Sequence, residues 1–353
     1  MRAMPAYNGR VIPPVPVFDL SAIPEKDRDR VGKLIPDPRH HEGYVHRTIN
    51  GIFDYYYLDA AIADGDNILL SGPTGSSKST LFRAYCAFRR LPLAIIESNA
   101  SMDLSTVLGR VDPNTLEWVD GTFTLVARYG GVGVAEEFNM INPRMGAGFH
   151  QLFSVARQLE LPENSESIKA GRGHQTPQEV EMDDGSIALM YLEPPQPTLF
   201  AANINPRNSG YAGTQRMNDA TLNRFGMPIP WDYLHEVEEQ LLDSAKLLEI
   251  GENLRTLEDI LSPVSTNALM ELERHWWRFG WVPALELFIG RFQDEEQGSI
   301  RRAFHGEHEN IVRELEAAEQ KRADDAATVN AMATEYVPVK KASTRRRTTR
   351  TKS

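Results

Sequence analysis

The sequence predicts an α/β fold in which helices flank a parallel sheet, followed by an all-helical C-terminal domain. Between about residues 51 and 231, short apolar runs alternate with segments of helical periodicity, which is the pattern of βαβ units. From about residue 234 onward the apolar spacing is helical. The length of 353 residues accommodates two domains at roughly 150 residues each.

Four short apolar runs are expected to form the strands of the sheet, because each is too short for a buried helix. The segment 80–90 has helical periodicity and directly follows a glycine-containing stretch, so it is expected to be the helix after the first strand. The four runs are residues 67–70, 92–97, 131–135 and 197–202.

We expect the chain to divide into five parts. The first is rich in Pro, Asp and Arg without steady periodicity, so it is predicted to be an arm or loop. One insertion in the core is expected to form a hairpin, with residues 158–168 paired to 186–192 around a long exposed tip. The parts are an N-terminal arm (1–45), an α/β core (46–233), a helical lid domain (234–306), a charged helix (307–337) and a basic, disordered tail (338–353).

Composition excludes several classes of protein. With 41% hydrophobic and 25% charged residues, the chain is not wholly disordered. Its apolar runs fall short of the ~18–20 residues of a membrane helix, and its first residues lack the apolar segment of a secretory signal. A single cysteine, Cys86, excludes an internal disulfide and a cysteine zinc site. We therefore expect a cytoplasmic protein that does not enter membranes.

The charge is unevenly distributed. Residues 340–353 contain seven Lys or Arg and no acidic residue. Because the net charge of the whole chain is −11, the rest of the chain has a net charge of −18. A body this acidic is a poor general binder of nucleic acid, because phosphate contacts need basic surface. The tail by itself offers a surface for a polyanion such as nucleic acid, although such runs are more often solvated ends.

A glycine-containing loop is the strongest chemical signal. Residues 72–80 read GPTGSSKST and lie between a predicted strand and a predicted helix, where a phosphate-binding loop belongs. Backbone N–H groups at a helix N-terminus favour polyphosphate; Lys78 would reach the β- and γ-phosphates and Ser79 would ligate Mg²⁺. Ser77 stands where the usual form, G-x-x-x-x-G-K-S/T, has glycine. The expected phosphate-binding residues are Gly72, Pro73, Thr74, Gly75, Ser76, Ser77, Lys78, Ser79 and Thr80.

Paired acids follow the third predicted strand. Glu136 and Glu137 end the segment GGVGVAEE, an arrangement typical of a Walker-B strand. In that arrangement the first acid holds Mg²⁺ through its water shell and the second polarises the attacking water. The first acid is normally Asp, and Glu136 is one methylene longer.

Two further residues are candidates for the same site. Asn205 ends the apolar run before Pro206, so its amide would lie beside the γ-phosphate if this strand neighbours the loop strand. Arg224 follows a glycine-rich segment, 210–213, and a short helical stretch. In a ring, such an arginine can reach the ATP of the neighbouring subunit and stabilise the transition state.

Together these segments resemble the AAA+ ATPases with a P-loop NTPase core, and within them the dynein-related subfamily and its MoxR-type branch, which includes CobS-like and CbbQ/NorQ-like proteins. The segments LGRVD at 108–112 and LEWVDGTF at 116–123 are similar to an insertion of that branch, and GYAGT followed by LNRF is similar to its segment before the last core strand. The resemblance covers about residues 66–306.

The resemblance implies a homo-oligomer, a hexameric ring that binds ATP and Mg²⁺ at subunit interfaces. By position, Lys78 and Ser79 are Walker A, Glu136 and Glu137 Walker B, Asn205 sensor 1 and Arg224 the arginine finger. It also implies a chaperone-like role on a protein client, with a partner carrying a von Willebrand A domain, and insert hairpins at 111–124 and 158–196 that transmit motion. Where the family's lid usually carries a sensor-2 arginine, this chain has Asn267. Two alternatives therefore remain: hydrolysis is slow, or a different lid arginine, such as Arg274, takes that role.

Three readings of function remain at this stage. The first is a Mg²⁺-dependent ATPase that couples hydrolysis to remodelling or activation of a protein partner. The second is a nucleic-acid-dependent motor that uses the basic tail for contact. The third is a scaffold that assembles with ATP but scarcely hydrolyses it. The first is favoured because Lys78, Glu137, Asn205 and Arg224 are all present.

Overall fold

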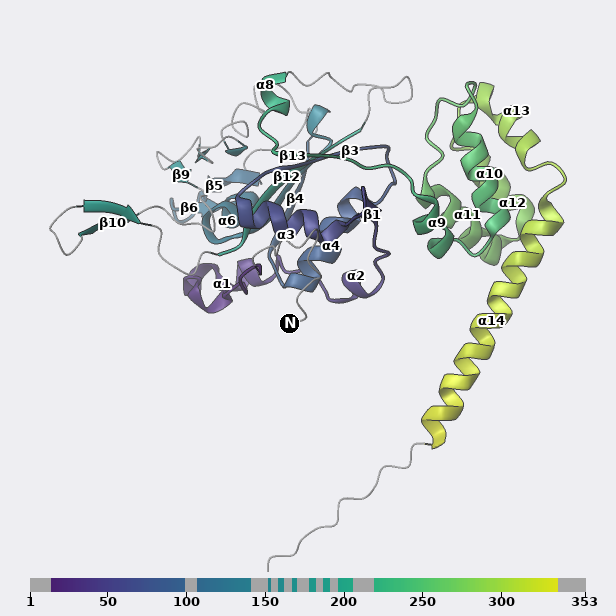
Figure 1. Ribbon diagram of the computed structural model, residues 1–353, viewed down its shortest axis with the longest axis horizontal. Helices are drawn as coiled ribbons and strands as arrows, with labels where there is room; N and C mark the ends of the chain where they lie inside the picture. The colour runs from purple at the N-terminus through teal and green to yellow at the C-terminus, as the bar shows by residue number, and fades with distance from the viewer. Residues whose placement is uncertain are drawn as a thin grey trace, which may run out of the picture.

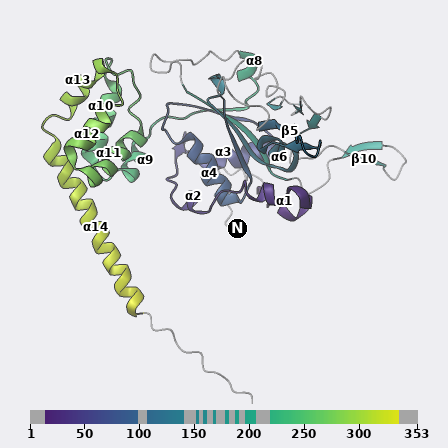
Figure 2. The same cartoon turned by 180° about the vertical axis from the view of Figure 1, so that it is seen from behind.

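The computed structural model describes residues 14–98, 107–140, 152–153, 158–161, 167–169, 178–181, 187–190, 196–205 and 219–335. They form an α/β core, a helical domain beside it and a long C-terminal helix (Figure 1). The predicted fold class is confirmed. The view from behind shows the helical domain joined to the core through the segment that follows the last strand (Figure 2).

The core is built on a five-stranded parallel sheet with the strand order β13-β3-β12-β7-β4. Both faces of the sheet are covered, which is why its strands are apolar runs rather than alternating ones. The edge strand β13 was not among the four predicted runs; it reads MPIP, and prolines are tolerated at an edge. The strands are β3 (Ile68–Ser71), β4 (Leu93–Glu97), β7 (Gly131–Glu136), β12 (Thr198–Ile204) and β13 (Met227–Pro230).

Two apolar layers sandwich the sheet. On one face, Ile68 and Val134 pack with side chains of α3 (Asp54–Asp64) and α4 (Lys78–Arg89). On the other face, Phe200 packs with Phe123 of α6 (Thr122–Tyr129). Because side chains alternate along a strand, the last residue of β7, Glu136, shares the face on which α4 lies.

The N-terminal part differs from the expected arm or loop. Val15, Phe18, Val31 and Tyr44 are buried and belong to the same apolar layer as α4. Each element here is too short to repeat an apolar spacing, so the sequence shows no period. The elements are η1 (Leu20–Ala22), α1 (Glu25–Gly32), α2 (Arg39–Glu42), β1 (Thr48–Ile49) and β2 (Ile52–Phe53).

The hairpin predicted across 158–196 is wrong in its pairing. β8 (Gln158–Glu160) pairs with β9 (Ser167–Lys169), and β10 (Gln178–Glu181) pairs separately with β11 (Ile187–Met190). Local pairing closes shorter loops, which costs less chain entropy. Another two-stranded hairpin, β5 (Gly109–Val111) with β6 (Trp118–Asp120), overlaps the other expected insertion, 111–124, and begins two residues before it.

Apart from α8 (Asp219–Leu222), which precedes β13 in the α/β core, the remaining helices form the domain that follows the sheet. Their shared apolar core includes Leu247, Leu269 and Phe288, and the long last helix joins it through Ile311 and Leu315 before extending away (Figure 1). Within the described residues, no helix combines the length and apolar character that crossing a lipid bilayer requires. The helices are α8 (Asp219–Leu222), α9 (His235–Leu241), α10 (Ala245–Thr256), α11 (Thr266–Phe279), α12 (Trp281–Ile289), α13 (Asp294–Ala303) and α14 (His308–Glu335).

Candidate functional site

The glycine-containing loop, residues 72–77, connects the carboxyl end of β3 to the first turn of α4. β3 lies inside the sheet, between β13 and β12, so the loop is flanked by the ends of neighbouring strands. The first N–H groups of α4 have no partner within the helix and carry its positive dipole end. This strand–loop–helix arrangement is the one that an anion-binding loop requires.

Two residues of the loop have left-handed backbone. Gly75 has φ +68° and Ser77 has φ +69°. A side chain in this region costs roughly 1–2 kcal/mol, so Ser77 keeps the backbone that glycine adopts readily, at the expense of strain. Gly72 is required for space, because an added Cβ would lie 1.5 Å from the carbonyl oxygen of Trp231.

Lys78 lies buried at the centre of the predicted set. Its ammonium donates hydrogen bonds to the carbonyl oxygens of Gly72 and Pro73, at 2.7 and 2.6 Å. It also donates to Oδ1 of Asn205 at 3.1 Å, so the structure brings these two predicted residues together. Burial lowers the pKa of Lys78 to about 8, although the nearby carboxylates of Glu136 and Glu137 act in the opposite direction.

Asn205 follows the end of β12, the strand that pairs with β3 on the side opposite β13. Its backbone carbonyl accepts a hydrogen bond from the amide of Asn139, at 3.1 Å. Asn139 is buried in η2 (Phe138–Met140), directly after the paired acids. One amide therefore ties the turn after β7 to the residue beside Lys78.

The paired acids occupy the end of β7. Glu136 is the last residue of the strand and Glu137 follows in a left-handed conformation, with φ +50°. Oε1 of Glu136 is buried and has no hydrogen-bond partner among the described residues. Both side-chain amide atoms of Asn203, on the neighbouring strand, are likewise buried without a partner there. Oε1 of Glu136 and Oδ1 of Asn203 are buried oxygen atoms of the kind that a Mg²⁺ ion and its water shell can satisfy, whereas the Nδ2 group of Asn203 is a donor and does not bind a cation.

Three side chains hold the loop carbonyls from outside the sheet. The guanidinium of Arg47 and the indole N–H of Trp231 both donate to the carbonyl oxygen of Ser76, at 2.5 and 2.7 Å. The hydroxyl of Tyr233 donates to the carbonyl oxygen of Thr74 at 2.6 Å. Carbonyls held on the outside leave the N–H groups of a loop for its concave side, which is the orientation that phosphate binding needs.

Arg47 connects these contacts to the rest of the molecule. It is 3% exposed, lies over the Trp231 ring at 4.6 Å from the centroid, and donates to the carbonyl oxygen of Asp232 at 2.6 Å. Its backbone N–H donates to the buried carboxylate of Asp54 at 2.9 Å. Burial lowers the pKa of the Arg47 guanidinium.

Arg224 lies at the opposite end of the sheet from the loop. It precedes β13, whose first residue pairs with Ile68 at the start of β3, and its carbonyl accepts a hydrogen bond from Asn67. At about 3.3 Å per residue, the length of β3 alone puts more than ~10 Å between this edge and the loop. The fold therefore does not bring Arg224 to the phosphate loop of its own chain.

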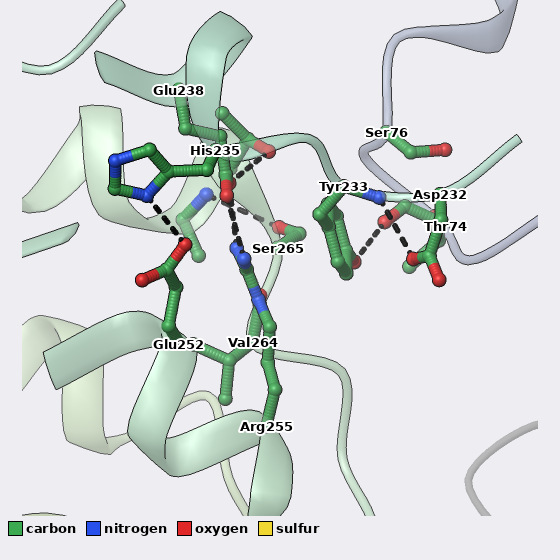
Figure 3. Close-up of polar contacts among 12 residues, drawn as sticks. Thr74, Ser76, Asp232, Tyr233, His235, Glu238, Glu252, Arg255, Val264 and Ser265 are labelled. Carbon is green, nitrogen blue, oxygen red and sulfur yellow. Dashed lines mark hydrogen bonds and ion pairs between the residues drawn. The ribbon is translucent and has the colours of Figure 1, made fainter. Parts of the chain in front are cut away.

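The lid touches the loop directly. A Cβ added at Gly75 would lie 2.6 Å from Cβ of Ser265, whose hydroxyl caps the N-terminus of α11. Figure 3 shows the residues around this junction, with Tyr233 pointing toward Thr74. Beside it is a pocket of about 510 Å³, lined by Pro73 of the loop and by lid residues that include Arg255.

The remaining predicted site residues are placed as follows. Asn267 is exposed in the first turn of α11, and Arg274 makes its ion pair with Glu271 on that helix, while the lid arginine that lines the pocket is Arg255. The segment 210–217 lies outside the described residues, as do 206–209 and the basic tail. In the loop and α4, Gly72 and Ser76 are buried, Pro73, Gly75, Ser77 and Ser79 are half-buried, and Thr74 and Thr80 are exposed.

Sequence reasoning missed the supports of the loop. Arg47, Trp231 and Tyr233 belong to no motif with a fixed spacing from Lys78, and they reach the site only through the fold. The weak signal in the sequence was a tryptophan and a tyrosine directly after the segment MPIP, at the boundary where the periodicity becomes helical.

One family model matches part of the core. Residues 67–225 match the family model for the AAA domain of the dynein-related subfamily. The parallel sheet, the phosphate loop and the helical lid fit the α/β fold of AAA+ ATPases. This match ends with Phe225, one residue after Arg224, so it covers every residue predicted for the site from Gly72 onward.

Two of the curated relatives are uncharacterized proteins. The chain is 29% identical over 208 residues to an uncharacterized protein of Staphylococcus haemolyticus, covering 54% of this chain and 69% of the relative. It is 26% identical over 171 residues to the uncharacterized protein YojN of Bacillus subtilis, covering 47% of each.

Two solved structures illustrate the similarity to proteins of known structure. NtrX from Brucella abortus, in complex with ADP, is 14% identical with a TM-score of 0.36; the match covers 68% of this chain and about half (49%) of NtrX. A mutant of RuvB from Thermotoga maritima is 12% identical with a TM-score of 0.33, and the match covers 71% of this chain and 66% of RuvB.

Proposed function

We propose that this chain, whose core matches an AAA domain, is a Mg²⁺-dependent ATPase in which each active site is completed by a neighbouring copy. The observation that carries the proposal is the buried contact between Lys78 and Asn205 at the mouth of the phosphate loop. In this contact the ammonium of Lys78 lies beside a polar group from the neighbouring strand, and both Glu136 and Glu137 are close enough to act on its pKa. This arrangement supports Lys78 as the cation that binds phosphate.

The roles follow from the chemistry of each group. The N–H groups of the loop and the ammonium of Lys78 bind the phosphates of ATP. Ser79 and Glu136 hold Mg²⁺, and the unpartnered Oε1 of Glu136 supports that role. When bound, the ion neutralises charge that develops on the phosphates during transfer.

Glu137 is proposed as the group that orients and polarises the attacking water. It is exposed at the end of β7 and is held in a left-handed conformation, which costs about 1–3 kcal/mol for a residue with a side chain. Strained residues of this kind concentrate at functional sites. Asn205 keeps its amide oxygen beside Lys78 and is positioned to contact the γ-phosphate.

Arg224 is proposed to act on the ATP of a neighbouring subunit. Its place at the opposite edge of the sheet prevents it from reaching its own loop, so a head-to-tail neighbour is the way in which it can contribute. Head-to-tail contacts that repeat around an axis close into rings. We propose a hexameric ring of the MoxR type.

The client is proposed to be a protein. The β10–β11 hairpin extends away from the core (Figure 1), whereas the β5–β6 and β8–β9 hairpins lie against it. We propose that these hairpins carry motion to a bound protein. Asp120 of the β5–β6 hairpin accepts hydrogen bonds from Trp118 and Arg128, which fixes its base on α6. The activity proposed is chaperone-like remodelling or activation of a client, with a partner that carries a von Willebrand A domain.

The ATPase proposal is tested by turnover against protein concentration, with sizing in ATP, for the wild type, Lys78→Ala and Arg224→Ala. A shared site predicts that the specific rate rises with concentration and that both variants are inactive, while Arg224→Ala still binds ATP. A flat specific rate together with normal turnover by Arg224→Ala would place the whole site within one subunit and contradict the ring.

A further inference from the structure

Tyr233 lies between the phosphate loop and the lid. It belongs to the short segment that joins β13 to α9, and its hydroxyl donates to the carbonyl oxygen of Thr74 at 2.6 Å. Its ring lies against the guanidinium of Arg255, 3.9 Å from centroid to Cζ. One side chain therefore contacts a loop carbonyl at its tip and a lid cation on its face (Figure 3).

Arg255 joins three parts of the lid. From α10 it makes a bidentate ion pair with Glu238 of α9, at 2.7 and 2.6 Å. Its Nε donates to the carbonyl oxygen of Val264, in the turn that leads into α11, at 2.8 Å. A guanidinium with this planar set of donors fixes the relative positions of the elements that it bridges.

Glu238 is the buried centre of this arrangement. The residue is 1% exposed, and besides Arg255 it accepts a hydrogen bond from the hydroxyl of Thr266 at 2.6 Å. Thr266 begins α11, next to Ser265, which packs on Gly75 of the loop. A buried carboxylate needs all of these partners, so its position and that of Arg255 are strongly linked.

The loop and the lid are thus connected in two ways that converge on the start of α11. One runs directly from Gly75 to Ser265. The other runs from Thr74 through Tyr233, Arg255 and Glu238 to Thr266. The pocket of about 510 Å³ alongside gives the lid room to shift when the loop changes.

We propose that Tyr233 and Arg255 are positioning residues that couple the conformation of the phosphate loop to the orientation of the lid. Neither residue needs to touch the nucleotide: a change in the direction of the Thr74 carbonyl moves the Tyr233 hydroxyl, and the Tyr233 ring moves Arg255 with the helices that it holds. The inference rests on the proposed function, because the ligand that changes the loop is ATP or ADP.

The test uses the full chain with conservative variants and ADP with Mg²⁺ as the probe. Tyr233→Phe removes only the hydroxyl, and Arg255→Lys keeps the charge but loses the bidentate geometry. Two matched controls make equivalent changes elsewhere: Tyr57→Phe removes a hydroxyl that donates to the carbonyl oxygen of Ile49, and Arg301→Lys alters a bidentate pair with Glu286 in the same lid.

Three quantities are measured for each variant: the affinity for ADP, the change in amide hydrogen exchange at the start of α11 on adding ADP, and kcat and KM for ATP. For Tyr233→Phe we expect ADP affinity within about threefold of wild type, loss of the ADP-dependent exchange change, and kcat lower by roughly 3–10-fold, the loss expected for one hydrogen bond. Arg255→Lys should behave similarly, and the double variant should be no worse than the more severe single one. Both controls should retain the exchange response.

The outcomes separate the coupling from the ATPase itself. If the wild type binds ADP and Tyr233→Phe still transmits the full exchange change, the coupling is wrong while the proposed function stands. If Tyr233→Phe and Arg255→Lys have strictly additive effects on kcat, they do not act through one contact, and the inference is likewise overturned. If the wild type binds no nucleotide, the proposed function fails first and the coupling with it.

Discussion

The phosphate loop is supported differently on its two sides. The side that faces the sheet carries the buried contacts of Lys78 with the loop carbonyls and with Asn205. The side that faces away from the sheet carries Arg47, Trp231 and Tyr233, which come from the N-terminal segment and from the junction with the lid. The comparison teaches that the chemistry of the site and its shape are supplied by separate sets of residues. The residues of the first set are the ones that the proposed phosphate binding requires. The residues of the second set reach the loop because of the way in which this chain folds.

The largest loss of ATPase activity is expected from a substitution on the side of the loop that faces the sheet. Lys78→Ala should reduce kcat/KM for ATP by roughly 10²-fold, because a charge-assisted hydrogen bond to phosphate is worth about 1.5–3 kcal/mol. Steady-state kinetics measure it. The matched control is Lys33→Ala, which removes an exposed ion pair with Asp29 and should leave turnover unchanged. Turnover by Lys78→Ala near the wild-type rate would mean that this loop is not the site.

A smaller effect on nucleotide binding is expected from a substitution among the other supports of the loop, Arg47, Trp231 and Tyr233. Arg47→Met removes two hydrogen bonds to carbonyl oxygens and the contact with Trp231, so it should lower the free energy of unfolding by about 2–3 kcal/mol and weaken ADP binding about tenfold. Chemical denaturation and ADP titration measure the two effects. Arg28→Met is the control, since Arg28 also donates to two carbonyls, those of Ser21 and Ile23, away from the loop. If both variants bind ADP equally well, Arg47 does not shape the loop.

The pKa of Lys78 gives a prediction for pH. With a pKa of about 8, the ammonium is charged below this pH and neutral above it. Bound phosphate favours the charged form, so ADP affinity should fall as the pH rises above about 8, by at most about tenfold per unit. Titrations from roughly pH 7 to 9 measure the slope. Lys78→Arg keeps its charge and should bind with no such slope; equal slopes in both proteins would assign the titration to another group.

The lowered pKa of Lys78 affects stability in the opposite direction from ADP affinity, because it makes the free energy of unfolding increase with pH. The folded value lies below the ordinary 10.5, so between about pH 8 and 10.5 the unfolded chain binds more protons at Lys78 than the folded chain does. Lys78 therefore contributes stability that increases as the pH rises through this window. Lys78→Ala should lack this increase, so the difference in unfolding free energy between wild type and variant should shift in favour of the wild type when denaturation above the window is compared with denaturation below it.

The smallest effect concerns Ser77. Ser77→Gly relieves a left-handed conformation worth about 1–2 kcal/mol but adds chain entropy worth about 0.5–1 kcal/mol, so a net gain of roughly 0.5 kcal/mol in unfolding free energy is expected. Arg90→Gly is a matched control outside the loop, at φ +57° after α4, and should gain a similar amount. Thermal denaturation measures both. A loss of stability in Ser77→Gly alone would show that the serine side chain makes a contact that outweighs its strain.

The fold class could be predicted because buried parallel strands are continuous apolar runs, and four such runs match β3, β4, β7 and β12. The order of the strands, the edge strand with its two prolines and the packed N-terminal segment have no local signature. The hairpins between Gln158 and Met190 were paired wrongly because alternating polar segments fix their register weakly.

The residues of the candidate site likewise divide into those that the sequence could predict and those that it could not. That Lys78, Glu136, Glu137 and Asn205 lie together could be predicted, because the expected phosphate and Mg²⁺ chemistry requires such groups at the ends of neighbouring strands. The outer supports could not, since Arg47 and Tyr233 are 186 residues apart and meet the loop only after β13 and the lid are in place. Their roles depend on hydrogen bonds to backbone carbonyls, which leave no trace in a motif.

The measurement that tests the central claim most directly is a mixing experiment. Lys78→Ala has a defective loop but an intact Arg224. Arg224→Ala has an intact loop but lacks the arginine that is proposed to contact the ATP of the neighbouring copy. If sites are shared between copies, two inactive proteins mixed in equal amounts regain ATPase activity, because at random about a quarter of the interfaces pair an intact loop with an intact arginine. If instead Arg224→Ala alone turns over ATP at the wild-type rate and the equal mixture shows only half of that specific rate, Arg224 has no part in a neighbour's site and the account is contradicted.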